Sequence, residues 1–395
     1  MRKFIEKIVE GGFLVSGSVT SFAILLIIFF LFKEATGLFN SPMVEEGYVL
    51  AVNSSNPVKK LSSEQIMDVF DSEVTSWKQL GGADEEIHLF RFSDLTNYYT
   101  EEELGADFQY VPEKISELVA REPGIIAFFP HQYLAKDFTG IVLSDGTIKP
   151  SEFFAGTEWY PTATPAPVFG LLPLLLGTLL VSVGAIALSL PFGMAVAIYM
   201  AEIANQRTRN LLKPVIELLA GIPSVVYGFF GLVVIVPLIQ RTLSLPVGET
   251  AFAGSVVLAI MALPTIITVA EDAMRTTPRA MKEASLALGA TQWQTVYKVV
   301  IPYSASGITS AVVLGVGRAI GETMAVLMVT GNAAVIPTSF FEPVRTIPAT
   351  IAAELGEAPA GGAHYEALFL LGAVLFLITL LLSVTVEYIS SKRKL

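Results

Sequence analysis

The sequence contains no cysteine, so disulfides, thiolate-bound zinc and thiol redox pairs are excluded. It is also poor in charge: 15% of its residues are charged, whereas about 25% is usual in soluble domains. Its motifs exclude further classes, because the P-loop pattern G-x-x-x-x-G-K-[ST], the G-x-S-x-G elbow and H-E-x-x-H are all missing. The three histidines have no metal-ligand spacing (His88, His131 and His364). We therefore expect neither an enzyme nor a bound cofactor or metal.

The few charges that the chain has are unevenly distributed. Residues 41–160 hold 21 of the 36 acidic and 8 of the 25 basic residues, a balance of −13 against −11 for the whole chain. The remainder is apolar and slightly basic, so two physically different pieces share one polypeptide. Charge patterns report mainly on solubility, which favours a solvated face over a binding surface for the acidic piece.

Long apolar stretches dominate the rest of the chain. A helix of roughly 20 apolar residues crosses a bilayer, and the sequence predicts six such spans, at about 13–32, 170–200, 215–239, 251–270, 303–330 and 367–389. The first span lacks a small-x-small cleavage site, since Lys33-Glu34-Ala35-Thr36-Gly37 follows it. We interpret it as a retained helix and not as a signal peptide.

Basic residues next to the spans predict the orientation in the membrane, because cytoplasmic flanks are enriched in lysine and arginine. With six spans, four basic clusters fall on one side (Arg2, Lys3 and Lys7; Arg207, Arg209 and Lys213; Arg275, Arg279, Lys282 and Lys298; Lys392, Arg393 and Lys394). The sequence therefore predicts a multi-pass cell-membrane protein with both termini in the cytoplasm and residues 41–160 outside.

The outside segment has the pattern of a small α/β domain. Strands are predicted at 48–52, 87–92 and 125–129 from their apolar character. Ser62-Ser63-Glu64-Gln65 is a capping box, which opens a helix with Ile66, Val69 and Phe70 on one face. A second helix is predicted at about 112–121.

One predicted cytoplasmic loop, residues 271–302, carries a specific pattern. It contains Lys282-Glu283-Ala284-Ser285-Leu286-Ala287-Leu288-Gly289-Ala290 and then Val299-Val300-Ile301-Pro302. Physically it suits a short helix, a glycine-permitted turn and a second short helix at the membrane surface. It resembles the Glu-Ala-Ala loop of ABC importer permeases, with Glu283, Ala284, Gly289 and Pro302 in matching places and Ser285 departing from the pattern. The alternative is an ordinary amphipathic surface helix.

Further stretches resemble the phosphate-specific (Pst-type) permeases, in particular their PstC-like subunit. They are residues 219–228 (LAGIPSVVYG), 315–325 (GVGRAIGETMA), 345–351 (RTIPATI) and 364–369 (HYEALF). The resemblance implies an all-α polytopic protein of the type I ABC importer permease fold, divided into a first span (1–40), an inserted domain (41–160) and a permease core (161–395). It also implies a second permease subunit, cytoplasmic ATP-binding subunits, a phosphate-binding protein and inorganic phosphate as partners.

The outside domain resembles one lobe of phosphate-binding proteins, through residues 60–70, 75–82 and 119–128. In those proteins a Ser-Gly-Thr run helps to hold phosphate. This chain has Arg91-Phe92-Ser93-Asp94 there, without the glycine that allows close backbone approach. We expect a docking or spacer role for the domain.

Arg318 and Glu322 are the charged residues of the predicted fifth span. An arginine fork meets phosphate oxygens bidentately and stays charged, and a helix would place Glu322 one turn later on the same face. The resemblance assigns both residues to the translocation path. The residues alone leave a structural ion pair open as the alternative.

Two other functions compete with a phosphate permease. One is a permease for another oxyanion, such as molybdate or sulfate. The other is a membrane-anchored phosphate sensor, which the sequence disfavours because only a few residues follow the last span.

Overall fold

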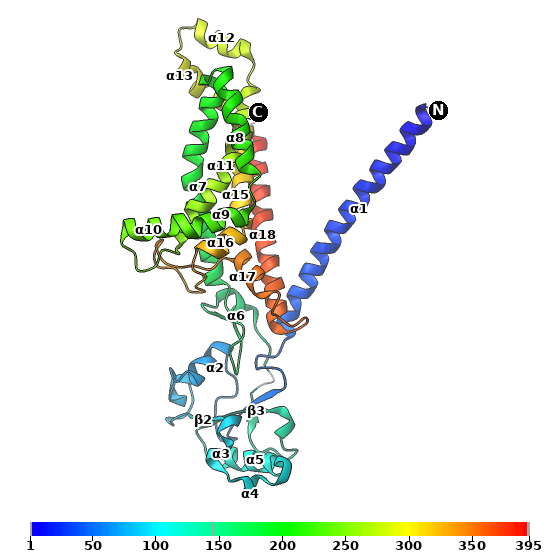
Figure 1. Cartoon of the computed structure of the whole chain (residues 1–395). Helices are drawn as coiled ribbons and strands as arrows, with labels where there is room; N and C mark the ends of the chain where they lie inside the picture. Colours follow the sequence, from blue (N-terminus) through cyan, green and yellow to red (C-terminus); the bar gives the residue numbers. More distant parts are fainter. Residues whose placement is uncertain (1, 144–145, 393–395) are drawn as a thin grey trace. The chain divides into compact units, whose positions relative to one another are not determined.

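The computed structural model describes residues 2–143 and 146–392, so Arg393 and Lys394 of the C-terminal basic cluster lie outside the described residues. The chain divides into two compact units, whose elements are labelled in Figure 1. One consists of Met1–Leu171 and Ala358–Leu370, and the other of Leu172–Glu357 and Leu371–Leu395.

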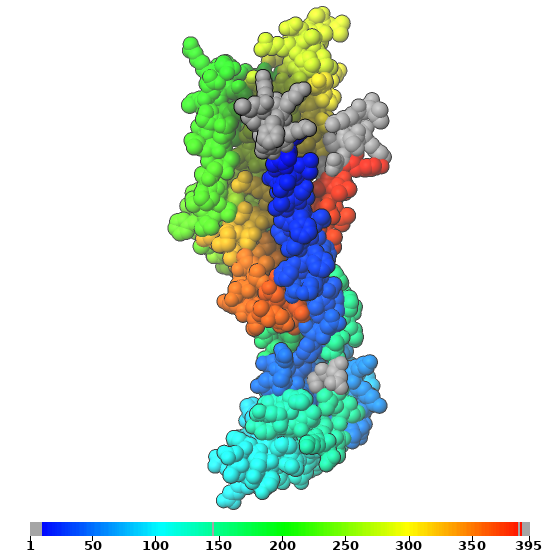
Figure 2. All heavy atoms as spheres, turned by 90° about the vertical axis from the view of Figure 1, so that its right-hand side faces the viewer, coloured from blue at the N-terminus to red at the C-terminus, as the bar shows by residue number. Residues whose placement is uncertain are grey.

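The first unit begins with a long apolar helix, α1 (Arg2–Gly37). Its candidate membrane span covers Glu10–Asn40, and no residue of the most apolar stretch is buried. Side chains of α1 accordingly lie on the surface along the helix (Figure 2). At its end, the Ser41 hydroxyl donates a 2.5 Å hydrogen bond to Glu366, in the first turn of α18 (Ala363–Lys392). The first predicted span is confirmed as a helix.

A four-stranded sheet forms the centre of the domain that follows. Its strands are β1 (Tyr48–Val52), β2 (His88–Arg91), β3 (Ile125–Pro130) and β4 (Ile141–Val142), in the order β2-β3-β1-β4. Strand β3 pairs parallel with β2 and antiparallel with β1, which pairs antiparallel with β4. The three strands predicted from the sequence are confirmed.

Helices cover both faces of this sheet, because successive residues of a strand point to opposite sides. Leu50 and Val52 pack with α2 (Ser63–Phe70), whereas Val49 and Ala51 pack with α5 (Val111–Arg121). The predicted capping box is present: the Ser62 hydroxyl accepts from Gln65 N at 3.2 Å, and Gln65 Oε1 accepts from Ser62 N at 3.0 Å. Shorter elements complete the domain, namely α3 (Leu95–Tyr98), α4 (Glu101–Leu104), α6 (Pro150–Ala155) and the pair β5 (Trp159–Tyr160) and β6 (Val168–Phe169).

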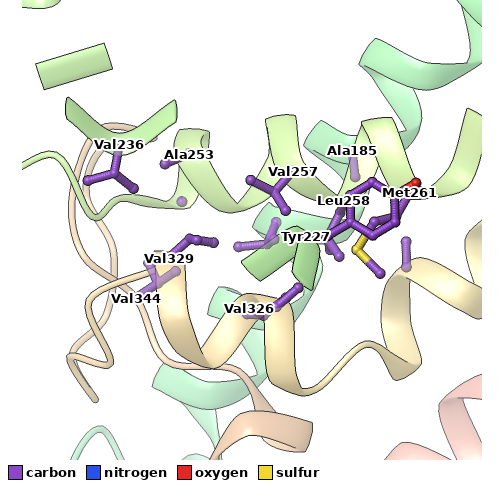
Figure 3. Packing of buried hydrophobic residues seen from close by; sticks show 14 of the residues in the cluster. Ala185, Tyr227, Val236, Ala253, Val257, Leu258, Met261, Val326, Val329 and Val344 are labelled. Carbon is purple, nitrogen blue, oxygen red and sulfur yellow. The ribbon is translucent and has the colours of Figure 1, made fainter. Parts of the chain in front are cut away.

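The second unit is a helical bundle built around α11 (Ala251–Arg275). This helix packs against α7 (Leu172–Ile198) and α15 (Ala305–Gly321), and 61% of its most apolar window is buried. The core combines small residues such as Ala185 and Ala253 with Val257, Leu258 and Met261 (Figure 3). Small side chains let helix backbones approach closely, which is how apolar helices associate where water does not drive burial.

Two of the predicted spans differ from the observed helices. Residues 206–220 form a separate helix, α8 (Gln206–Ala220), because Gly221 ends it and Pro223 precedes the next helix, α9 (Ser224–Phe230). The third candidate span is therefore Ser224–Leu243, which continues through a π-helical turn, η7 (Gly231–Ile235), into α10 (Val236–Leu243).

The fifth predicted span, 303–330, is not one helix. Helix α15 ends at Gly321, and a short helix, α16 (Met324–Val329), begins after two further residues. Helix α17 (Ile347–Glu354) comes later in the chain. Upstream, Gln292–Tyr303 and Ala305–Gly321 meet at 73°. Among the described residues, five helices are long and apolar enough to cross a membrane, or six if this bent pair is one span, in agreement with the predicted polytopic architecture.

Candidate functional site

Arg318 lies near the end of α15 and is half-buried. Within the described part of the chain, no carboxylate is within ion-pair distance of its guanidinium. Tyr227 of α9 lies close enough to Arg318 to interact electrostatically, although its hydroxyl already donates to Leu219 O at 2.8 Å. Arg318 thus brings a charge with free donors to an otherwise apolar helix.

The glycines around Arg318 divide into two groups. A Cβ on Gly315 would lie 2.9 Å from Ile266 of α11, so this glycine permits close packing inside the bundle. Gly317 and Gly321 are exposed, and a Cβ on either would meet no atom within 4 Å. Gly317 borders an apolar pocket that Val316, Ile320 and Leu382 also line.

Glu322 lies four residues after Arg318, at the C-terminal boundary of α15. Its φ of −72° is helical, whereas its ψ of 130° is extended, so the helix ends there. Glu322 Oε1 accepts a hydrogen bond from Ala325 N at 3.4 Å, at the start of α16. That Arg318 and Glu322 act together on one face stays a prediction.

The predicted helix–turn–helix of the 271–302 loop is confirmed. It consists of α12 (Arg279–Ala287), a turn at Gly289 with φ of +86°, and α13 (Gln292–Thr295). Glu283, Ala284 and Gly289 are exposed on this loop, and Pro302 is exposed in α14 (Ile301–Tyr303), directly before α15. Glu283 and Ala284 therefore lie on α12, Gly289 forms the turn that follows it, and Pro302 comes after α13.

Apolar side chains on the same loop are also exposed. Leu288 is 90% exposed and Trp293 58%, and Met281 and Leu286 are exposed as well. A cluster of large apolar groups on a polar, basic loop is characteristic of an interaction surface.

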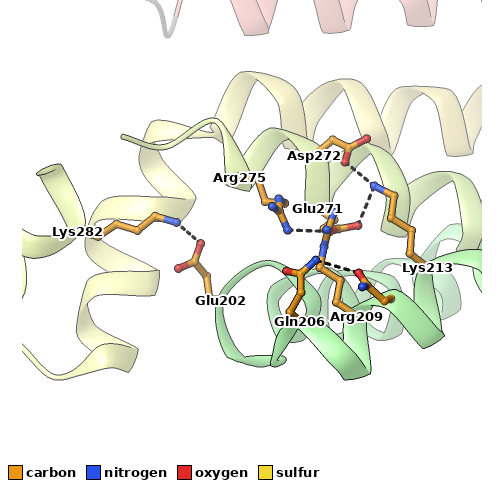
Figure 4. Close-up of polar contacts among 9 residues, drawn as sticks. Glu202, Gln206, Arg209, Lys213, Glu271, Asp272, Arg275 and Lys282 are labelled. Atoms are coloured by element: carbon orange, nitrogen blue, oxygen red, sulfur yellow. Dashed lines mark hydrogen bonds and ion pairs between the residues drawn. The ribbon is translucent and has the colours of Figure 1, made fainter. Parts of the chain in front are cut away.

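Sequence analysis missed an ion cluster at the end of α11 (Figure 4). Glu271 is fully buried, and its carboxylate lies 2.6 Å from Arg209 Nε, 3.4 Å from Lys213 Nζ and 3.8 Å from Arg275. Lys213 also hydrogen-bonds Asp272 at 2.9 Å, and this bond is the main reason that the pKa of Lys213 is raised. The cluster joins α8 to α11.

From the sequence, the basic residues of this cluster indicate only the orientation of the chain in the membrane. An acidic residue at the end of an apolar span was the available signal, since intramembrane charges usually have partners. Arg209 and Glu271 are 62 residues apart in sequence, however, and no local pattern connects them.

In the domain formed by residues 41–160, side chains of the domain itself hydrogen-bond the backbone next to β2. Asp94 Oδ2 accepts from Arg91 N at 3.0 Å, and the Arg91 guanidinium donates to Phe70 O at 3.0 Å. Elsewhere in the domain, burial followed by repulsion from Glu64 and Asp68 raises the pKa of Glu158. These features disfavour an added anion.

Comparisons with known proteins match two separate segments of the chain. Residues 189–395 match the family described as "Binding-protein-dependent transport system inner membrane component". Residues 30–175 match the "PBP superfamily domain".

Individual relatives agree with the first of these matches. A probable ABC transporter permease protein, YqgH, from Bacillus subtilis is 42% identical over 62% of this chain and 80% of its own length. The phosphate transport system permease protein PstC of Mesorhizobium japonicum is 38% identical over 60% of this chain and 77% of its own. Among solved structures, the MetNI methionine ABC transporter in an inward-facing conformation is 19% identical, with a TM-score of 0.43, over 57% of this chain and 94% of that one.

Glu271→Gln should destabilise the helical bundle. The amide keeps the size of the side chain but leaves three cations around a buried neutral group, and removing one partner of a buried ion pair costs about 3–5 kcal/mol. Thermal unfolding of the detergent-solubilised chain is expected to begin at a clearly lower temperature.

Asp272→Asn is the matched control, because Asp272 is 58% exposed and exposed pairs contribute about 0–1 kcal/mol. Equal effects of the two substitutions would contradict the buried role of Glu271.

Proposed function

Because this chain belongs to the family of binding-protein-dependent transport system inner membrane components, we propose that it is the PstC-like permease subunit of an ATP-driven importer of inorganic phosphate. It is a multi-pass membrane protein, and its relatives include phosphate transport permeases. The observation that carries the choice of an anion is Arg318, a half-buried cation with free donors on an apolar helix.

The physical argument starts from the cost of that charge. A charged side chain at the bilayer centre costs ~2.5–3.5 kcal/mol on insertion scales, so it is retained where it faces a cavity or a partner. An anion that leaves water needs fixed donors, and a guanidinium offers several in one plane. Gly317 and Gly321 leave space beside Arg318, which supports a path along this side of α15. Glu322, at the break that follows, would border the same path.

The family implies an ATPase and a substrate-binding partner. In our proposal the second membrane subunit is a different permease, so that the pair is a heterodimer, and the substrate-binding partner is a phosphate-binding protein. Both termini lie in the cytoplasm and residues 41–160 lie outside the cell. The basic flanks of the spans support this orientation.

The exposed 271–302 loop is the contact with the ATPase in this proposal. Glu283 and Ala284 lie on the exposed helix α12, Gly289 forms the turn, and Pro302 begins the return to α15. Exposed Leu288 and Trp293 would enter a groove of the ATPase. The outside domain acts as a docking module or spacer.

Arg318→Ala should abolish most phosphate uptake. Charge-assisted, bidentate hydrogen bonds are about twice as strong as neutral ones, and their loss should lower uptake by at least about tenfold. Arg318→Lys should retain part of the activity, because an ammonium keeps the charge but lacks the planar fork. The measurement is labelled phosphate uptake per unit of membrane-inserted protein.

Arg241→Ala, at an exposed position near the end of α10, controls for the loss of one positive charge. Near-normal uptake by Arg318→Ala would remove Arg318 from the path. Competition by molybdate or sulfate that exceeds competition by unlabelled phosphate would replace phosphate with another oxyanion.

Gly289→Glu should abolish uptake and weaken retention of the ATPase subunit. Within this chain a side chain at Gly289 meets no atom within 4 Å, so a loss would arise at the partner. Gly289→Asn is the control, since asparagine tolerates positive φ better than other residues with a Cβ. Normal co-purification and uptake of Gly289→Glu would exclude this turn from the contact.

Residues 41–160, expressed alone, should bind phosphate more weakly than about 1 mM, or not at all. Asp94 already satisfies backbone where an anion would bind, and it repels one. Calorimetry on this fragment tests the expectation, and Asp94→Gly should improve any residual binding. Micromolar affinity of the unmodified fragment would support the sensor function instead.

A further inference from the structure

Both short helices of the 271–302 loop attach to a single residue, Glu202. The Lys282 ammonium on α12 lies 2.5 Å from the Glu202 carboxylate. The Gln292 side-chain amide, on α13, donates to the main-chain oxygen of Glu202 at 3.0 Å. Figure 4 shows the Lys282–Glu202 contact separately from the Glu271 cluster.

This attachment matters because α12 has little other hold on the bundle. None of its residues is buried. It packs against α13 and the π-helical turn η8 (Val296–Val300), and Ser285 shares a 2.9 Å hydrogen bond with Thr295. The loop is therefore held together internally, while its ion pair with Glu202 bridges 80 residues of sequence.

The Glu202–Lys282 pair is also shielded from water. The Glu202 side chain is 10% exposed and that of Lys282 is 22% exposed. Salt and solvent screen such a pair less than an exposed one. The contact can therefore hold a fixed geometry.

Glu202 lies at the end of α7, so a movement of its side chain would act directly on that helix. It belongs to a π-helical turn, η6 (Tyr199–Ile203), that ends α7. Turns of this kind are rare and concentrate at functional positions. Helix α7 packs along α11, and α8, which starts four residues after Glu202, is fixed to α11 by Glu271.

We propose that Glu202 is the positioning residue that transmits movement of the 271–302 loop to α7, through its ion pair with Lys282. This inference rests on the proposed function, since it concerns how ATP hydrolysis on a partner drives transport. When the pair is broken, the loop still binds the ATPase, but its movement no longer reaches α7.

The test is charge reversal in the complete transporter, purified with its bound subunits and reconstituted in vesicles. Glu202→Lys and Lys282→Glu should each lower the phosphate transported per ATP hydrolysed by about fivefold, the factor that corresponds to loss of one such pair. The amount of bound ATPase should stay unchanged. The double variant Glu202→Lys with Lys282→Glu should restore the ratio, because it rebuilds the pair in reverse.

If the charge-reversal variants do not assemble into a transporter, substitutions that only remove a charge provide the same test. Glu202→Gln and Lys282→Met each remove one charge and should lower the ratio in the same direction, whereas Asp272→Asn, which removes a nearby pair within the bundle, should not. A normal ratio in the single variants, or a double variant as poor as either single one, would overturn the proposal. If the unmodified transporter moves no phosphate, the proposed function is wrong. If it moves phosphate, but the phosphate transported per ATP hydrolysed does not change on substitution of Glu202, only this inference is wrong.

Discussion

A hydrocarbon bilayer offers no hydrogen-bond partner and solvates no charge, and the rest of this structure depends on that constraint. The crossing segments are helical, so their backbone groups bond within the segment. Some of their hydroxyls bond back to the same helix, as Thr178 does to Leu174 O and Ser255 to Ala251 O. The charge of Glu271 is met by three cations. Arg318 has no carboxylate within ion-pair distance in the described bundle, and this observation supports the proposal that it binds an anion.

The same constraint separates apolar packing from ionic contacts along the bundle. Its middle is apolar and closely packed through small residues, so it moves as a body more readily than it deforms. Ionic contacts lie at the ends of α7 and α11, where Glu202 and Glu271 each bridge elements distant in sequence, and a further pair, Arg345 with Glu354, lies at α17. Helices that pack along their length and are joined by ion pairs at one end move together as a unit. In our proposal a partner acts on this unit through the exposed 271–302 loop.

The sequence predicted the features that depend on composition or on near neighbours. Apolar length identified the spans, and the Ser62–Gln65 box marked the start of α2. The Gly289 turn followed from glycine's freedom at positive φ. The break after Gly321 could not be predicted in this way, because apolar length alone does not mark where a helix ends. The contacts of Glu202 and Glu271 also escaped, since they form only after helices 60 or more residues apart have packed.

The domain that contains the four-stranded sheet has its two ends side by side. Glu45 N donates to Pro165 O at 3.0 Å, so two positions 120 residues apart are hydrogen-bonded neighbours. A module whose ends adjoin can be spliced into a short loop in one genetic event, because it adds a domain without lengthening the distance between the flanking segments. Gain or loss of such a domain during evolution would leave the helices on either side free to keep their pairing.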